Sequence, residues 1–296
     1  MSGSIIYQPK KRKAFDVKRN VNDMWKSTPT VEGAGVNLKR GFSNSEVPLF
    51  DPFLLFDDFH SADPSDYLRG FPWHPHRGIE TITYMLKGEV EHGDSMGNSG
   101  TIHPGDVQWM TGGSGIIHQE MPKGDAQGAM AGFQLWANLP AAEKMMAPRY
   151  REVKQDEIPV IDYSGNSKIN LICGSVGEHS GPVKDIVTDP LYIDVTVGPD
   201  GVFEIPVEEG YTAFLYMIEG SAVIPADIGA ETIVLFEAQG DSIALGAGNR
   251  GARFLLCSGK PLGEPVAWGG PIVMNTREEL RTAFEEYQNG TFIKAR

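Results

Sequence analysis

The sequence predicts an all-β protein built from two similar barrels. Short runs rich in β-branched and aromatic residues are interrupted at close intervals by Gly, Pro, Asp and Asn, which is the pattern of strands and turns. These runs lie at residues 79–86, 107–110, 132–137, 169–173, 191–197, 214–218 and 254–257. An internal repeat indicates that there are two barrels, and a helical pattern near the C-terminus predicts one added helix.

The helical pattern covers residues 276–287. Thr276 can cap the helix, and Glu279 stands three residues later, as in a capping box. The apolar residues that follow recur at the spacing of one helix face: Leu280, Ala283, Phe284 and Tyr287. We therefore expect a C-terminal helix that packs on a barrel.

The repeat divides the chain into two halves. Residues 82–90 align with residues 214–222 at an offset of 132. The matched pairs are Tyr84 with Tyr216, Met85 with Met217, Leu86 with Ile218, Gly88 with Gly220 and Gly78 with Gly210. Gly105-Asp106 then meets Gly240-Asp241 at an offset of 135. Repetition on this scale indicates two similar domains, which we place at residues 1–148 and 149–296.

Composition and charge exclude several classes of protein. The 296 residues are 41% hydrophobic, and no apolar run approaches the ~20 residues of a membrane helix. Residues 1–40 hold nine Lys or Arg and three Asp or Glu, which leaves a net charge of −19 for the remainder. Such an acidic body repels phosphate backbones, so we expect neither direct nucleic-acid binding nor membrane insertion.

The ends and the cysteines suggest the compartment. The N-terminus lacks the apolar core of a signal peptide, and Cys173 and Cys257 are too few for a disulfide framework. We expect a cytoplasmic protein. The run containing Lys10, Arg12 and Lys13 is either a nuclear-import signal, if the source is eukaryotic, or a solvated basic start to an edge strand.

Two short motifs carry the candidate chemistry. His74 and His76 are two residues apart, as are His118 and Glu120, so each pair points to one face of an extended strand. Two such pairs in one barrel could supply four ligands to one metal ion. Neutral imidazoles with a carboxylate suit Fe(II), Mn(II), Ni(II), Cu(II) or Zn(II). We interpret His92 and His103 as turn or rim residues, and we assign no role to His60 or His179.

The region around these motifs resembles the pirin family of the cupin superfamily. The resemblance rests on residues 70–122, which include G-F-P-W-H-P-H-R-G-I-E and G-G-S-G-I-I-H-Q-E-M-P, and on residues 54–59, 134–136 and 273–276. It implies two antiparallel cupin (jelly-roll) barrels with one mononuclear iron in the N-terminal barrel. It also implies the ligands His74, His76, His118 and Glu120. In many cupins a Glu at the position of Glu80 is a ligand, whereas in pirins the carboxylate ligand comes from the H-x-E pair. On a regular strand Glu80 would share a face with His74 and His76, so we expect an outer hydrogen-bond acceptor there rather than a ligand.

The resemblance implies two alternative functions. Pirins from several sources show quercetin 2,3-dioxygenase activity, so the substrates would be a flavonol and O2. Glu120 would take the proton of the flavonol 3-hydroxyl. Pirins also resemble metal-dependent, redox-sensing regulators that bind transcription factors or metabolic enzymes, so a protein partner is the alternative. We expect a monomer, with Fe(II) as the cofactor ahead of Mn, Ni, Cu or Zn.

The second barrel is predicted to bind no metal. At the offsets of the repeat, the positions of His74 and His76 become Pro206 and Glu208. The positions of His118 and Glu120 become Arg253 and Leu255, and no histidine follows His179.

Overall fold

The computed structural model describes residues 17–294 and confirms the predicted all-β fold with two barrels and a C-terminal helix. The basic run that contains Lys10, Arg12 and Lys13 lies outside the described residues. Every ladder between named strands of residues 17–294 is antiparallel. Within this range no helix is both long enough and apolar enough to cross a membrane.

The chain forms two compact units that are not its two contiguous halves. The N-terminal barrel unit contains residues 28–155 and 262–294, and the C-terminal barrel unit contains residues 17–27 and 156–261. The expected division at residues 148 and 149 therefore differs from these units, because each barrel takes up a terminal segment from the other end of the chain. Backbone pairing, which no local pattern reveals, fixes both segments.

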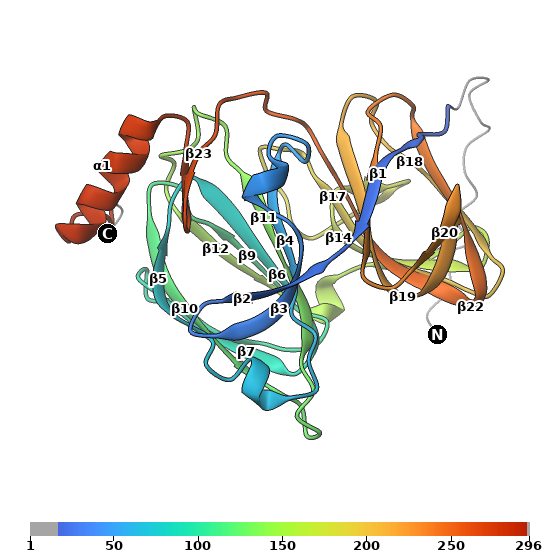
Figure 1. Cartoon of the computed structure of the whole chain (residues 1–296), viewed down its shortest axis with the longest axis horizontal. Helices are drawn as coiled ribbons and strands as arrows, with labels where there is room; N and C mark the ends of the chain where they lie inside the picture. The colour runs from blue at the N-terminus through green and yellow to red at the C-terminus, as the bar shows by residue number, and fades with distance from the viewer. Residues whose placement is uncertain (1–16, 295–296) are drawn as a thin grey trace. The chain divides into compact units, whose positions relative to one another are not determined.

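The N-terminal barrel unit has a seven-stranded and a four-stranded sheet, plus a two-stranded ribbon (Figure 1). The larger sheet runs in the order β12 (Arg149–Val153), β9 (Val107–Thr111), β6 (Ile79–Lys87), β11 (Ala131–Asn138), β4 (Phe53–Asp58), β3 (Val36–Phe42) and β2 (Thr28–Glu32). The smaller runs β5 (Phe71–His76), β10 (Ile116–Lys123), β7 (Glu89–Asp94) and β8 (Ser99–Ile102). The ribbon pairs β23 (Ala267–Gly269) with β24 (Ile272–Met274). This unit also has 3-10 turns at Asn44–Glu46 and Pro64–Asp66, and a further one, Gln155–Glu157, begins at its last residue before the other unit.

Helix α1 (Arg277–Gln288) forms where the sequence predicts it. The hydroxyl of Thr276 accepts a hydrogen bond from the backbone N–H of Glu279, and the Glu279 side chain accepts one from the backbone of Thr276. The buried side chain of Ala283 packs with Ile272 and Met274, and the helix contacts β23 and β24. Figure 1 shows the helix beside this ribbon. The apolar stripe thus attaches α1 to the N-terminal barrel unit.

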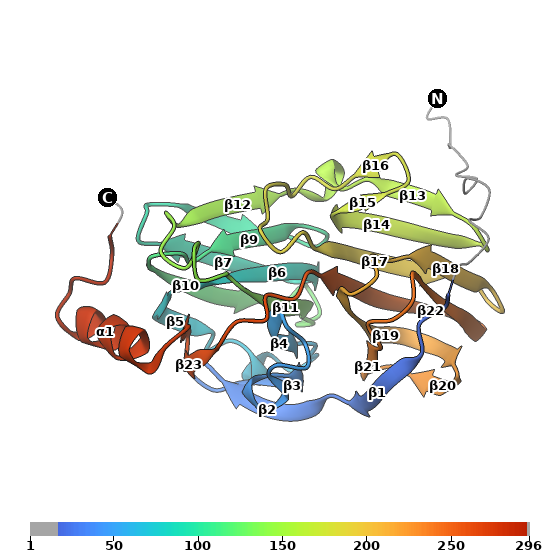
Figure 2. The ribbon, with the colours of Figure 1, turned by 90° about the horizontal axis from the view of Figure 1, so that it is seen from above.

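The C-terminal barrel unit is one nine-stranded sheet with a separate two-stranded ribbon. Its main path is β1 (Val21–Lys26), β21 (Thr232–Phe236), β19 (Thr212–Ile224), β22 (Ser242–Gly259), β17 (Leu191–Val197), β14 (Ser167–Cys173) and β13 (Val160–Tyr163). Strand β18 (Val202–Pro206) pairs with β22, and β20 (Ala226–Gly229) pairs with β19. The ribbon is β15 (Ser175–Val176) with β16 (His179–Ser180). Figure 2 shows β1 alongside β21.

The internal repeat is visible in the backbone. The three glycine pairs that the offsets align all have positive φ: Gly78 and Gly210 (79° and 83°), Gly88 and Gly220 (71° and 74°), and Gly105 and Gly240 (88° and 105°). Residues with a Cβ rarely adopt this conformation. At Gly88 and Gly220 a Cβ would also lie 2.7 Å and 2.1 Å from a backbone carbonyl oxygen. The repeated glycines therefore mark the same turns in both barrels.

Candidate metal centre

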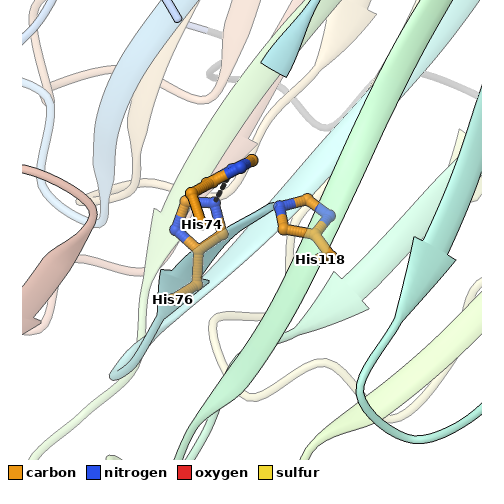
Figure 3. A group of neighbouring side chains, drawn as sticks. All are labelled: His74, His76 and His118. Atoms are coloured by element: carbon orange, nitrogen blue, oxygen red, sulfur yellow. Dashed lines mark hydrogen bonds between the residues drawn. The ribbon is translucent and has the colours of Figure 1, made fainter. Parts of the chain in front are cut away.

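Adjacent strands of the smaller sheet bring the three motif histidines together. Strand β5 ends in His74-Pro75-His76, and β10 carries His118 directly opposite His74. The ring centroid of His118 lies 4.3 Å from that of His74 and 4.9 Å from that of His76. One nitrogen of each ring lies within 4.8 Å of the others (Figure 3). The nitrogens of His74, His76 and His118 thus lie close together, as the i, i+2 spacing of the first pair predicts.

Backbone carbonyls fix the rings of His74 and His76. The Nδ1 of His74 lies 2.9 Å from the carbonyl oxygen of Pro72, and the Nδ1 of His76 lies 3.0 Å from that of Pro271. A carbonyl can only accept, so each Nδ1 carries the proton and each Nε2 keeps a free lone pair. The two Nε2 atoms are 3.1 Å apart, as the dashed line in Figure 3 marks. Two ligands on adjacent octahedral positions with bonds of about 2.1 Å would be about 3 Å apart.

His118 is the strongest indication that this cluster could hold a cation. Its side chain is completely buried, and neither ring nitrogen has a hydrogen-bond partner within the described part of the chain. A buried polar atom left without a partner costs about 1–3 kcal/mol. Burial lowers the pKa of both His118 and His76 well below the usual histidine range, and the neighbouring imidazoles act in the same direction. Buried imidazoles of this kind fit a metal ion, and His74, His76 and His118 could together hold one.

Glu120 is close to the histidines in sequence but is not part of the nitrogen cluster. The pairing of β10 with β5 shifts register between His118 and Glu120. The buried carboxylate accepts hydrogen bonds from the Thr83 hydroxyl at 3.1 Å and from the Gln134 amide at 3.2 Å. The structure therefore groups three of the four predicted ligands and holds the fourth on its own hydrogen-bond network.

Glu80 does not share the face of His74 and His76. The chain turns at Gly78, so β5 and β6 belong to different sheets. The Glu80 carboxylate is buried, accepts a 2.7 Å hydrogen bond from Thr111 and lies 3.7 Å from Arg149. Burial raises its pKa. Its observed partners are thus those of a structural carboxyl, and none of them is a motif histidine.

His92 is a buried neighbour of the three imidazoles, so its expected place in a turn or at a rim is wrong. It lies on β7 opposite Glu120, its ring centroid is 5.4 Å from that of His118, and it stacks on Tyr150 at 4.9 Å. Its Nε2 is 3.4 Å from the carboxylate of Asp94. The motif His92-Gly93-Asp94 has the same i, i+2 spacing as the two ligand pairs, and that spacing could have identified it. His103, by contrast, is exposed as expected.

A cavity of about 550 Å³ opens beside the histidines within the N-terminal barrel unit. Its lining includes His74 and His76, and its apolar part includes Phe71, Trp136 and Trp268. Trp136 contacts His76 edge-on at 5.1 Å and lies 6.0 Å from Trp268. The volume is within the roughly 300–1,000 Å³ of small-molecule sites. The arrangement can therefore place a flat aromatic molecule next to the imidazoles.

The residues that complete this wall come from the returning C-terminal segment. Trp268 lies in β23, Gly270 and Pro271 lie between β23 and β24, and the Trp268 indole donates a 2.7 Å hydrogen bond to the carbonyl of Gly270. The buried ammonium of Lys144 donates to the carbonyls of Gly78 and Val273 and to Asn138. This contact attaches β24 to the turn that follows His76.

Comparison with known proteins identifies the family. The pirin family model matches residues 35–137, and the model of the pirin C-terminal cupin domain matches residues 192–293. A pirin-like protein of Caulobacter vibrioides is 46% identical over 275 residues, covering 93% of this chain and 99% of the relative. Human pirin is 39% identical over 269 residues, covering 87% and 88%. The solved structure of a quercetin 2,3-dioxygenase from Acinetobacter baumannii superposes with a TM-score of 0.84 at 29% identity, covering 93% and 99%. This chain belongs to the pirin family.

Proposed function

We propose that the protein is a mononuclear iron dioxygenase that opens the central ring of a flavonol such as quercetin. The observation that carries the proposal is the cluster of His74, His76 and His118, in which two Nε2 lone pairs and an unpartnered buried imidazole converge. Glu120 is the proposed fourth ligand. Three imidazoles and one carboxylate leave up to two positions of an octahedral ion open, as a catalytic metal requires.

The reaction needs no further reductant. A flavonol and O2 give a ring-opened ester and carbon monoxide, so both oxygen atoms of O2 stay in the ester and one ring carbon leaves. When bound, the ion supplies Lewis acidity toward the flavonol oxygens and electron exchange with O2. The solved relative from Acinetobacter baumannii is called a quercetin 2,3-dioxygenase, which supports this choice of substrate.

The protein groups have separate roles in this proposal. Glu120 takes the proton from the flavonol 3-hydroxyl, a step that needs a heavy-atom distance of about 2.6–3.2 Å. Thr83 and Gln134 each donate to one of its oxygens, so the carboxylate is held in place before the substrate enters. Phe71, Trp136 and Trp268 provide apolar faces for the aromatic rings and exclude water from them.

The proposal is tested by metal analysis and turnover on the same preparations. Protein purified without oxygen and loaded with Fe(II), Mn(II) or Ni(II) is mixed with quercetin and O2, and carbon monoxide release is measured. We expect the iron form to release one carbon monoxide for each flavonol consumed, and the His118→Ala variant to release none. The matched control is His103→Ala, which removes an exposed imidazole outside the cluster. A fully loaded protein that consumes no flavonol would contradict the proposal and favour the regulatory alternative.

A further inference from the structure

A second polar cluster lies on the wall of the same cavity. It consists of Glu32, Arg40 and Asp57, and none of the three belongs to the imidazole cluster. Arg40 donates two hydrogen bonds to Asp57, at 2.9 Å and 2.8 Å, and one to Glu32 at 2.7 Å. We call these three residues the carboxylate–guanidinium cluster.

This cluster carries a net negative charge. Two carboxylates face one guanidinium, and these are the cavity's charged lining residues apart from the two histidines. Asp57 is buried, which raises its pKa to about 6 although the bonds from Arg40 oppose the shift. At pH 7 the ionised form of Asp57 therefore still predominates, and the charge of the guanidinium is more than balanced.

The cluster also has a free hydrogen-bond acceptor. Oε1 of Glu32 is bound by Arg40, whereas Oε2 accepts no hydrogen bond from the residues that the structure describes. The Glu32 side chain is 42% exposed and lines the cavity, so a molecule in the cavity can reach its carboxylate. An ionised acceptor of this kind binds an O–H donor with roughly twice the strength of a neutral one and repels a carboxylate.

We propose that the carboxylate–guanidinium cluster recognises a phenolic hydroxyl of the substrate other than the one that chelates the metal. This inference rests on the proposed function and narrows its substrate class to uncharged, polyhydroxylated flavonols. The aromatic wall accepts the flat rings, and Glu32 accepts the hydroxyl. A ring carboxylate that would meet the cluster is repelled by like charge, since the guanidinium of Arg40 is already paired with Glu32 and Asp57.

The test is a set of anaerobic titrations of the iron-loaded full chain, so that binding is measured without turnover. The ligands are 3-hydroxyflavone, which has only the chelating hydroxyl, then galangin, quercetin and a flavonol with a 4′-carboxylate. Dissociation constants come from quenching of tryptophan fluorescence. We expect a gain of roughly tenfold in affinity when hydroxyls are added to at least one ring, and weaker binding of the carboxylate.

The Glu32→Gln variant separates charge from shape, because glutamine keeps an oxygen that can accept from Arg40. It should lose most of the tenfold gain and bind the carboxylated flavonol better, whereas 3-hydroxyflavone should bind as before. The matched control is Glu91→Gln, an exposed residue of β7 outside the cavity. Affinities of galangin and quercetin no higher than that of 3-hydroxyflavone in the wild type, or an unchanged series in Glu32→Gln, would overturn this inference alone. Failure of 3-hydroxyflavone itself to bind would overturn the proposed function as well.

Discussion

The Nδ1 atom of His76 donates a hydrogen bond of 3.0 Å to the carbonyl oxygen of Pro271, a residue 195 positions later in the chain. A ring at the candidate metal centre is therefore oriented by the segment that follows the last strand of the C-terminal barrel unit. Arg77, the next residue, reaches the same end of the chain, since it donates to the carbonyl of Phe292 and to the carboxylate of Glu286. The site depends on the C-terminal segment for its geometry.

Replacing Arg77 with Met should destabilise the N-terminal barrel unit by about 2–4 kcal/mol. The buried guanidinium of Arg77 donates hydrogen bonds to the carbonyls of Ser114 and Phe292 and pairs with Glu286. Its Cζ lies 4.2 Å from the centroid of the Phe292 ring. Methionine fills similar space but donates nothing, so these acceptors lose their partner. Urea denaturation measures the change. A loss below about 0.5 kcal/mol, the usual range of surface substitutions, would show that these contacts contribute little.

Shortening Trp268 to Ala should weaken flavonol binding by roughly tenfold and leave metal content unchanged. The indole forms part of the cavity wall and lies 6.0 Å from Trp136, and aromatic pairs of this kind contribute about 0.5–1.5 kcal/mol beyond area burial. Trp268→Phe should retain most of the affinity because it keeps a ring. Isothermal titration with quercetin under nitrogen gives both values. Similar quercetin affinities for the alanine and phenylalanine variants would show that an aromatic ring at position 268 does not contribute to flavonol binding.

The sequence could predict most of the fold and three members of the site for identifiable reasons. Alternating strand patterns, the repeat of Tyr84 and Gly88 at Tyr216 and Gly220, and the capping box at Thr276 are all local signals. The i, i+2 spacing of His74 and His76 places both side chains on one face of β5. Pairing with β10 then puts His118 next to them.

The contribution of distant segments had no such signal. The pairing of β1 with β21 and the approach of Pro271 to His76 join residues about 200 positions apart. Alternation tells which side of a strand is buried but not which strand lies next to it. Alternation also fails to predict the orientation of Glu80. The chain turns at Gly78, which has a positive φ, and β6 then belongs to a different sheet from β5.

Stability should depend on pH through Lys144. Burial lowers its pKa from 10.5 to about 7, so between these values the unfolded chain binds a proton that the folded chain does not. The free energy of unfolding must then rise with pH across this window. Relative to Lys144→Met, which cannot ionise, we expect a gain of about 2 kcal/mol from pH 7 to pH 9. Denaturation of both proteins at several pH values measures the gain, and parallel curves would show that the ammonium stays charged in the fold.

Replacing His92 with Phe should lower metal affinity by about tenfold while His74, His76 and His118 remain. Its ring lies between that of His118, at 5.4 Å, and that of Tyr150, at 4.9 Å, so it fixes the position of His118 without belonging to the nitrogen cluster. Phenylalanine keeps a ring beside Tyr150 but loses the contact that the Nε2 of His92 makes with the Asp94 carboxylate at 3.4 Å, so the ring is held less firmly against His118. Competition with a chelator of known affinity gives the change. Unaltered affinity in this variant would show that His92 acts only through packing.

The metal content of the intact chain tests most directly whether the imidazole cluster binds a metal ion. Protein loaded anaerobically with Fe(II), desalted and analysed by mass spectrometry of the elements should hold about one ion per chain, because the described residues form one imidazole cluster. The His76→Ala and His118→Ala variants should retain less than about a tenth of that amount, and His103→Ala should retain all of it. A full equivalent of tightly bound metal in either ligand variant would contradict the assignment of the site.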